Sequence, residues 1–328
     1  MLALPLSEIR EGREIDFHQR LIGNIRRAEM HGEKMNIIIR ETTRPGFEQI
    51  TTLGERFYLR MSDRKEFFSN TWICDYVPMD DYVVDWIARV GSDHAKEYRA
   101  SQGRYGGKVH KAIECILENG RIGMHETFPD NDEGSSFSEL TPREYRAVMT
   151  FKDWWNDFKY DEIDVLVGQY KSGAKKGQDK YEKQRVEVKL EVLEREATHY
   201  NEELGYACTL DLRVKRGEEL WLIDYKISKY VGLSYKCQLA GIANCDGLRG
   251  IPHRRAILQV GYEENKKGWK FNEVEDTWDC WLAAHTFFKR ENADKRPKQY
   301  EYPVTLYLDS KDDLTEQLTA SIKQQKKK

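Results

Sequence analysis

Two acidic residues and a lysine near the middle of the chain have the types and the spacing to hold a metal ion. Asp224 and Lys226 end an apolar segment that starts at Leu220, and Asp211 stands in the segment before it. Side chains alternate between the faces of a strand, so Asp224 and Lys226 point the same way. If the two segments pair as strands, Asp211 comes beside Asp224. Two carboxylates at one place repel each other unless a cation lies between them, and oxygen ligands suit Mg²⁺ or Mn²⁺.

The same residues also have a purely structural interpretation. Asp224 and Lys226 could form an ion pair at the rim of a sheet, which would contribute about 0–1 kcal/mol if exposed. However, Asp224 follows apolar residues in a segment that we expect to be buried, where a carboxylate without a role is costly. The sequence therefore favours a functional site at this position.

The composition indicates a folded, soluble protein inside the cell. Hydrophobic residues make up 39% of the 328 residues, which is enough apolar material for a core. The formal net charge of −3 does not indicate a nucleic-acid partner, so an enzyme acting on one would have to sort its charges locally. The sequence shows neither an apolar run of membrane-spanning length nor a signal-peptide core. We therefore expect a cytoplasmic protein with no membrane partner.

The cysteines indicate reduced thiols rather than a disulfide framework. They stand at positions 74, 115, 208, 237, 245 and 280. No two of them form a Cys-x-x-Cys pair, and the chain is far larger than a disulfide scaffold. We expect most of these thiols to be buried.

The N-terminal half of the chain changes from strand to helix periodicity. Residues 7–34 are charged and compatible with a helix. Short strands are predicted next, at residues 35–40, 49–53, 56–61 and 70–75. Helices follow, predicted at residues 81–90, 92–101 and 106–118. Residues 129–138 are expected to form a polar loop.

The C-terminal half is expected to be rich in strands. Thr141, Pro142 and Glu144 form a helix start of the capping-box type, and that helix should continue through residues 154–155. Strands are predicted at residues 162–170, 185–194, 204–215, 220–226, 256–262 and 268–274. Two helices are predicted among them, at residues 234–244 and 277–290.

This order of elements predicts an α/β fold with a central mixed sheet flanked by helices. We expect residues 1–80 to form a β-containing extension that packs on the core. Residues 81–310 would form the core itself, and residues 311–328 a polar, basic tail.

Four segments, in chain order, resemble the RecB-like branch of the PD-(D/E)XK nuclease superfamily. They are residues 106–114 around His110, residues 205–211, residues 223–226 and residues 235–238. The N-terminal strands look similar to those of phage and mitochondrial single-strand exonucleases of this branch. The resemblance implies a restriction-endonuclease-like core. At Ile242 the chain departs from the family, which usually has a tyrosine there.

The resemblance implies a catalytic centre that binds Mg²⁺ or Mn²⁺. Its metal ligands would be His110, Asp211, Asp224 and the backbone carbonyl of Tyr225. Asp211, Asp224 and Lys226 would be the catalytic residues, with Lys226 orienting or deprotonating the attacking water or stabilising charge on the phosphate. The iron–sulfur cysteines of some relatives have no counterpart in the spacings here, so we predict no such cluster.

Other acidic residues could support this centre. Glu114 lies one helical turn from His110 on the same face and could position it; a salt-bridged helix residue is the alternative. Three glutamates precede the strand of Asp211, and one of them could reach the metal while at least two should face solvent: Glu191, Glu194 and Glu196.

Contacts with DNA are expected on both sides of the centre. Tyr235 and Gln238 stand on the helix after the Asp-x-Lys motif, where Gln238 could equally be a surface residue. Three residues at and beside the start of the histidine helix are expected to contact DNA, the tyrosine by stacking on a base: Arg104, Tyr105 and Lys108. The lysine-rich residues 171–183 could border the path of the strand, and a solvated hairpin tip is the alternative.

The resemblance implies a metal-dependent DNA exonuclease that hydrolyses phosphodiester bonds in phage or bacterial DNA recombination, repair or processing. Its substrate would be single-stranded DNA or duplex ends, and a single-strand annealing protein is a candidate partner. A phage-encoded enzyme would act in the cytoplasm of the bacterial host. Two alternatives stay open: an endonuclease of a restriction or defence system, and a catalytically silent DNA-binding module on the same fold.

Overall fold

The computed structural model describes residues 35–37, 41–44, 46–52, 55–130, 136–296 and 300–302. By its internal contacts the chain divides into two compact units. One unit is Arg40–Pro297, which contains every predicted site residue, and the other combines Met1–Ile39 with Lys298–Lys328.

The described part of the second unit is one pair of short strands. β1 (Met35–Ile37) pairs antiparallel with β15 (Tyr300–Tyr302). The helix predicted at residues 7–34 and the basic tail predicted at residues 311–328 lie outside the described residues.

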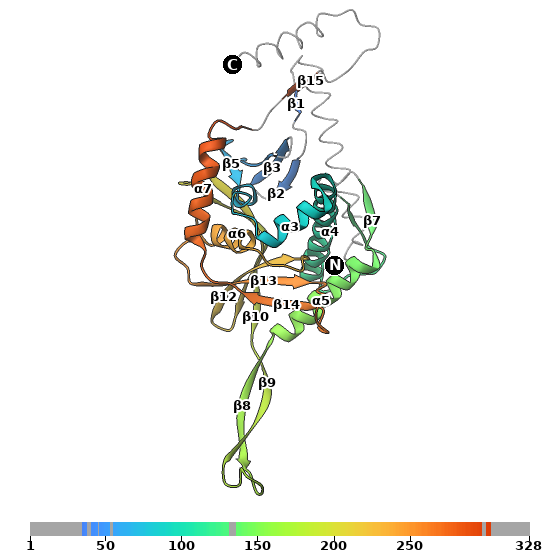
Figure 1. Ribbon diagram of the computed structural model, residues 1–328, viewed down its shortest axis with the longest axis vertical. Coiled ribbons are helices and arrows are strands. Elements are labelled where there is room, and N and C mark those ends of the chain that lie inside the picture. The colour runs from blue at the N-terminus through green and yellow to red at the C-terminus, as the bar shows by residue number, and fades with distance from the viewer. Residues whose placement is uncertain are drawn as a thin grey trace, which may run out of the picture. The chain divides into compact units, whose positions relative to one another are not determined.

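A nine-stranded mixed sheet forms the centre of the larger unit (Figure 1). Its strands lie in the order β14, β13, β12, β11, β5, β4, β3 and β2, and β10 also pairs with β11. The pairs β12–β13 and β5–β11 are parallel, while the other neighbours are antiparallel. The strands are β2 (Glu41–Arg44), β3 (Phe47–Thr52), β4 (Glu55–Arg60), β5 (Glu66–Ser69), β10 (Leu190–Asn201), β11 (Tyr206–Arg216), β12 (Glu219–Lys226), β13 (His253–Val260) and β14 (Trp269–Glu273).

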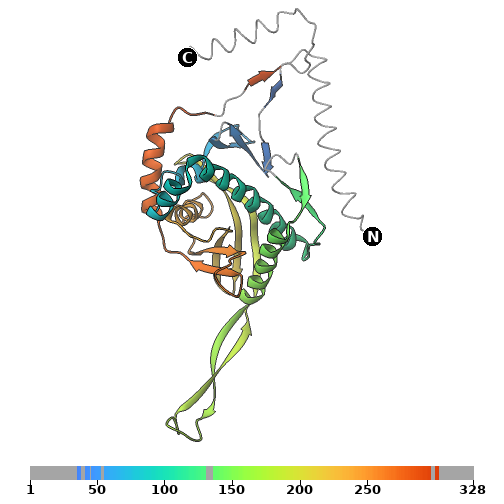
Figure 2. The same cartoon turned by 45° about the vertical axis from the view of Figure 1, so that its right-hand side comes forward.

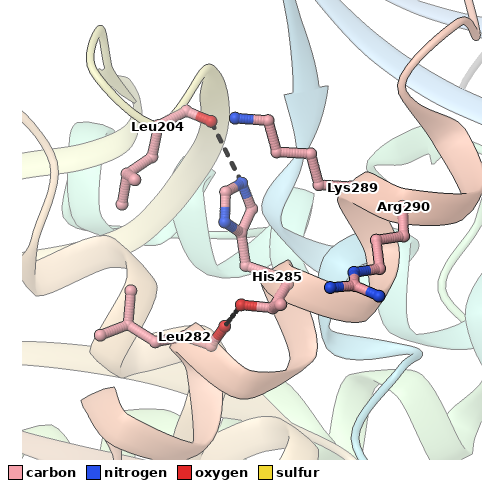
Figure 3. Close-up of a pocket in the computed structure, with 6 residues that line it drawn as sticks. Leu204, Leu282, His285, Lys289 and Arg290 are labelled. Atoms are coloured by element: carbon pink, nitrogen blue, oxygen red, sulfur yellow. Dashed lines mark hydrogen bonds between the residues drawn. The ribbon is translucent and has the colours of Figure 1, made fainter.

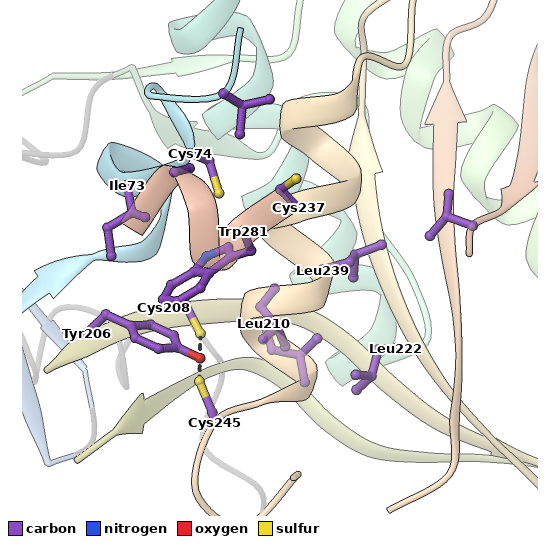
Figure 4. Packing of buried hydrophobic residues seen from close by; sticks show 14 of the residues in the cluster. Ile73, Cys74, Tyr206, Cys208, Leu210, Leu222, Cys237, Leu239, Cys245 and Trp281 are labelled. Atoms are coloured by element: carbon purple, nitrogen blue, oxygen red, sulfur yellow. Dashed lines mark hydrogen bonds between the residues drawn. The ribbon is translucent and has the colours of Figure 1, made fainter. Parts of the chain in front are cut away.

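Helices cover both faces of this sheet. Consecutive residues Leu222 and Ile223 of β12 are both fully buried but belong to different core clusters, because strand side chains alternate between faces. The cluster of Leu222 includes α2, α6 and α7, where Trp281 lies beside Tyr206 (Figure 4). The cluster of Ile223 includes α4 and α5. The helices are α2 (Asn70–Cys74), α3 (Asp81–Val90), α4 (Ser92–Asn119), α5 (Pro142–Phe158), α6 (Leu233–Ala243) and α7 (Trp278–Asn292).

This architecture confirms the predicted class, an α/β fold with a mixed central sheet flanked by helices. The sheet also crosses the boundary that the sequence placed at residue 80. Phe68 of β5 pairs with Tyr206 of β11, so the strands before residue 70 belong to the same sheet as the strands of the predicted core. The N-terminal strands therefore extend the sheet of the predicted core.

The prediction of a strand at residues 70–75 is wrong. The strand β5 ends at Ser69, and the next residues form the short helix α2. Asn70 explains the change, because its amide donates to Gln238 O and its Oδ1 accepts from Trp281 Nε1. These bonds tie α2 to α6 and α7, a tertiary effect that a six-residue apolar pattern does not show.

The two helices predicted at 92–101 and 106–118 form a single helix, α4. The prediction left residues 102–105 outside both helices, but they are helical, and a helical glycine such as Gly103 costs only about 1 kcal/mol relative to alanine. A Cβ at Gly106 would make an ordinary contact with Ile227 Cδ1 at 3.8 Å, so the chain after the Asp-x-Lys motif passes close to α4 here.

The predicted start of α5 is confirmed. The Thr141 side chain accepts from the Glu144 amide at 3.3 Å, and the Glu144 carboxylate accepts from the Thr141 amide at 2.6 Å. The loop predicted at 129–138 is flanked by two short paired strands, β6 (Thr127–Pro129) and β7 (Phe137–Glu139).

A two-stranded hairpin leaves the body of the larger unit after α5. It consists of β8 (Tyr160–Gln169) and β9 (Asp179–Glu187), and both views show it projecting away from the sheet (Figures 1 and 2). The strand predicted at 185–194 is wrong, because β9 ends at Glu187 and β10 begins at Leu190. The described part of the chain contains no helix with the length and apolarity needed to cross a membrane.

Gly241 allows α6 to pack against α2 and α7, and we expect its replacement to be destabilising. A Cβ here would overlap Asn70 Oδ1 and lie 2.8 Å from Trp281 Nε1, two atoms that share a hydrogen bond. Gly241→Ala should therefore lower the free energy of unfolding by about 1–3 kcal/mol, measured by urea denaturation. The control is Gly103→Ala in α4, where nothing lies within 4 Å of the added atom. It should be neutral or stabilising, and an equal loss at both positions would contradict the explanation.

Candidate metal centre

The main chain of Tyr225 lies at the centre of the candidate site. β12 pairs with β11 only as far as Ile223 and Leu212, so the two strands separate just before the Asp-x-Lys motif. Asp211 occupies the point of separation, and its Oδ2 accepts from the Tyr225 amide at 2.7 Å. The carbonyl of Tyr225 accepts from His110 Nε2 at 3.2 Å.

His110 connects α4 to the two strands. Its Nδ1 lies 3.5 Å from Asp211 Oδ1, and its ring packs edge-on against the buried ring of Tyr225 at 5.6 Å. The structure therefore brings together three of the residues that the sequence predicted as ligands, His110, Asp211 and Tyr225.

Glu196 is the third charged member of the cluster. Its Oε1 lies 3.7 Å from His110 Nδ1, and its side chain is only 9% exposed. It stands opposite Asp211, because Arg195 pairs with Leu212 and Ala197 pairs with Leu210. The sequence offered three glutamates here without distinguishing them. Glu196 comes opposite Asp211 because the register of β10 shifts between Val192 and Glu194. The spacing of residue types in the sequence does not reveal this shift.

The backbone of Glu196 is in a conformation that non-glycine residues seldom adopt. Its φ is 45°, which lies in the left-handed region and costs about 1–2 kcal/mol for an L-residue. Such strain often occurs at functional sites, where neighbouring structure holds an uncommon conformation in place.

His110, Glu196 and Asp211 have the spacing of a metal-binding group. One ligand atom from each lies within 4.8 Å of the others, and the described residues contain no second such group of histidine, cysteine or acidic side chains. Burial disfavours the charged imidazole, but the charges and hydrogen bonds of Asp211 and Glu196 outweigh it and raise the pKa of His110 to about 10. The two carboxylates therefore create a place that strongly favours positive charge.

Asp224 and Lys226 form a buried ion pair next to this group. Asp224 Oδ2 lies 2.6 Å from Lys226 Nζ, and Nζ lies 5.0 Å from the centre of the Tyr235 ring. Burial raises the pKa of Asp224 to about 6, Lys226 opposes the shift, and the charge of Asp211 adds to it. Burial would lower the pKa of Lys226, but Asp224 and Asp211 raise it above its usual value, so the amine is an ammonium.

The ligand-spaced group therefore contains Glu196 where the sequence predicted Asp224. The charges of Asp211 and His110 affect the pKa of Asp224, but the Asp224 carboxylate is paired with Lys226. Tyr235, predicted to contact DNA, instead lies against the ammonium of Lys226 and would help to hold it in place.

Lys108 is not available to bind DNA, contrary to the prediction. Its side chain is buried, and Nζ donates to Asp130 Oδ1 at 3.1 Å, to Ser138 Oγ at 2.5 Å and to Glu139 O at 2.7 Å. These acceptors lie around the β6–β7 pair, so Lys108 joins α4 to that hairpin. The partners come from residues far along the sequence, and for this reason local pattern did not indicate burial.

The other predicted contact residues have mixed surroundings. The Tyr105 hydroxyl donates to Arg143 O, and the Arg143 guanidinium lies 4.6 Å from the centre of its ring, so one ring face is covered. Arg104 is exposed on α4. Glu114 pairs with Lys111 at 2.9 Å, which matches the alternative interpretation as a salt-bridged helix residue.

Gln238 and the remaining glutamates lie outside the ligand-spaced group. Gln238 is partly buried on α6, and its main-chain carbonyl accepts from Asn70. Glu194 interacts with His199 and Arg213, and Glu191 is exposed 3.8 Å from Lys189. Two of the three glutamates before the Asp211 strand are thus occupied elsewhere.

A surface pocket on α7 contains none of the predicted site residues. It is lined by Leu204 and by five residues of the helix, among them His285, whose Nε2 donates to Leu204 O at 3.2 Å (Figure 3). It belongs to the opposite side of the sheet from His110, because α7 and α4 pack on different core clusters. The candidate centre is therefore identified by its side chains and not by this pocket.

No protein-family model and no curated protein matches this chain.

We expect the buried contacts of Lys108 to contribute to the stability of the fold. Lys108→Met keeps the aliphatic packing but removes the cation that pairs with Asp130 and the hydrogen bond to the Glu139 carbonyl, so the free energy of unfolding should fall by about 1–3 kcal/mol. Thermal and urea unfolding measure the change. Arg104→Gln, on the exposed face of the same helix, should stay within about 0.5 kcal/mol of wild type. An unchanged stability in Lys108→Met would show that the buried contacts contribute nothing.

Proposed function

We propose that this protein is a metal-dependent deoxyribonuclease of the PD-(D/E)XK type. One observation carries the proposal: an imidazole and two carboxylates at metal-ligand spacing lie next to a buried aspartate–lysine pair, joined through one residue, Tyr225. Hydrolysis of a phosphodiester needs both the metal-binding group and the lysine, because the phosphate is an anion and the attacking water needs activation.

The donor set fits a hard divalent cation. His110, Glu196 and Asp211 supply one nitrogen and carboxylate oxygens, and the Tyr225 carbonyl is a fourth candidate donor beside them. Carboxylates and carbonyls suit Mg²⁺ and Mn²⁺, and the imidazole is compatible with the latter. The same two acids raise the pKa of His110, so the imidazole would have to lose its proton before its nitrogen could bind the ion. A bound ion of this kind lowers the pKa of coordinated water and offsets phosphate charge.

The chain's own residues have separable tasks. Lys226, held as an ammonium by Asp224 and packed on Tyr235, would donate hydrogen bonds to the scissile phosphate or the attacking water. Asp224 keeps that ammonium in place. Asp211 has two tasks, because one oxygen holds the Tyr225 amide while the other faces His110.

The fold supports the same assignment. The strand pair β11–β12 is followed by α6, and the acidic residues lie where the two strands separate. The mixed sheet has α4 with His110 on one face and α6 with Gln238 on the other. Their order along the chain is the one that the resemblance implies. Within this proposal the enzyme acts on DNA ends as an exonuclease.

Metal binding tests the site without any substrate. Wild-type protein should bind Mn²⁺, measured by the loss of the free-ion signal in electron paramagnetic resonance. Asp211→Asn and Glu196→Gln should each weaken binding at least about tenfold, because each removes one ligand charge. Glu191→Gln on the same strand is exposed and serves as the control. Binding that is equally strong in all four proteins would exclude this cluster as the metal site.

Turnover tests the role of Lys226. On linear DNA with Mg²⁺ or Mn²⁺, Lys226→Ala should reduce the cleavage rate about 10²–10³-fold, the usual effect of removing one group that stabilises transition-state charge. Its binding of Mn²⁺ should persist, because Lys226 is not a ligand. Lys229→Ala is the matched control, since that lysine is exposed and pairs with Glu264 at 3.0 Å.

The topology of the substrate separates the modes of cleavage. An exonuclease degrades linear DNA and leaves closed circular DNA intact, whereas an endonuclease cuts both. Absence of cleavage by the wild-type protein with every divalent metal, despite Mn²⁺ binding, would refute the enzymatic proposal.

A further inference from the structure

The β8–β9 hairpin, residues 160–187, is a projecting arm whose tip is the loop of residues 170–178. Ten residues of β8 span about 33 Å at the usual rise of a strand. Most of its side chains are exposed, and its strands pair mainly with each other (Figures 1 and 2). A two-stranded hairpin alone is only marginally stable, so the arm requires an explanation.

The base of the arm is firmly attached to the sheet. Arg216 of β11 donates to Phe158 O at 2.7 Å and to Tyr160 O at 3.0 Å, and it also pairs with Asp161. Arg185 pairs with Asp157 of α5 at 2.7 Å. These bonds fix the direction in which the arm leaves the body.

The tip is an ordered loop and not a frayed end. The Tyr170 amide donates to Gln178 O at 3.0 Å, and the Gly177 amide donates to Tyr170 O at 2.9 Å. Gly173 and Gly177 have φ values of 82° and 84°, conformations that glycine adopts without strain. Lys175 Nζ lies 5.7 Å from the centre of the Tyr170 ring.

Charge is distributed unevenly along the arm. On the shaft, Lys183 pairs with Glu162 at 3.0 Å and Lys180 pairs with Glu182 at 2.5 Å. The tip contains three exposed lysines and no acidic residue: Lys171, Lys175 and Lys176. Within the described part of the chain these three lysines have no acidic partner. A protein of net charge −3 thus presents an uncompensated positive group at the end of a fixed arm.

We propose that the tip of this arm binds the sugar–phosphate backbone of nucleic acid, at a distance from the metal centre. This inference rests on the proposed nuclease function, which supplies the polyanion. Lysines act as point charges on phosphates without reading sequence, and Tyr170 adds a ring beside them. The arm therefore holds the part of the substrate that is not being cut.

The shaft offers the main alternative, a protein partner. Leu166, Tyr181 and Val186 are exposed there and could contact a second copy of the chain. The charge of the tip favours nucleic acid, because a partner on the shaft would not explain three lysines left unpaired beyond it. The two interpretations differ in what the tip lysines do.

The test compares two triple variants in duplex binding. The tip variant carries Lys171→Glu, Lys175→Glu and Lys176→Glu, and the control carries Lys152→Glu, Lys266→Glu and Lys289→Glu, which are exposed on other elements. Both change net charge equally. Fluorescence anisotropy with a 40-base-pair duplex in EDTA measures affinity across a range of salt concentrations. For the tip variant, we expect at least about tenfold weaker binding and a salt slope smaller by about three units, one for each lost phosphate contact.

Substrate length gives a second measurement. An oligonucleotide of about eight nucleotides is shorter than the arm at about 3.4 Å per nucleotide, so its rate of cleavage should be the same in wild type and tip variant. Long duplexes should be cleaved more slowly by the tip variant at limiting DNA. Circular dichroism establishes that both variants are folded.

The outcomes separate this inference from the nuclease proposal. Equal losses in the two triple variants, unchanged affinity in the tip variant, or no duplex binding by wild type would each overturn the role of the tip. So would a tip variant that binds DNA normally but changes its oligomeric mass in sedimentation, which would assign the arm to a second copy. Duplex binding that depends on the tip in a protein that never cleaves DNA would refute the nuclease proposal and leave this inference standing.

Discussion

The separation of β11 from β12 is the constraint on which the candidate centre depends. Beyond the pair Leu212–Ile223 the register of β11 with β12 ends, yet Tyr225 continues β12 beside β13 and is buried. A buried amide and carbonyl without partners would cost free energy. Asp211 and His110 supply those partners, one from the neighbouring strand and one from α4. The same two side chains thus serve the fold and the site.

Because Asp211 and His110 both hold the Tyr225 main chain and belong to the candidate site, several charges lie close together. Asp211, Asp224 and Glu196 are all nearly buried, an arrangement that is unfavourable unless cations accompany it. Lys226 offsets Asp224, whereas the charged form of His110 supplies one positive charge to both Asp211 and Glu196. The left-handed backbone of Glu196 adds local strain to this balance. A sheet built only for stability would place apolar side chains here, and the proposed metal site would account for the charged ones.

The parts of the structure that follow from local pattern could be predicted from the sequence. The strands around residues 204–215 and 220–226 were placed to within two residues, and their hairpin register puts Asp211 next to the Asp-x-Lys strand. The proximity of His110 came from a family resemblance, since no spacing rule links residue 110 to residue 211. Features that depend on distant partners were missed. Lys108 is buried by residues of β6 and β7, α2 is held by Trp281, and Glu196 is selected by a bulge in β10.

The pairing of β5 with β11 joins parts of the chain that are synthesised at different times. Phe68 and Ser69 of β5 pair with Tyr206 and Ala207, about 140 residues later. During synthesis the N-terminal strands therefore emerge long before the strand that completes their sheet. Until then they present an open edge, which can associate with other nascent chains. Rapid, correct folding should accordingly depend on how long this first meander stays shielded, which makes translation speed and chaperone supply relevant to the yield of native protein.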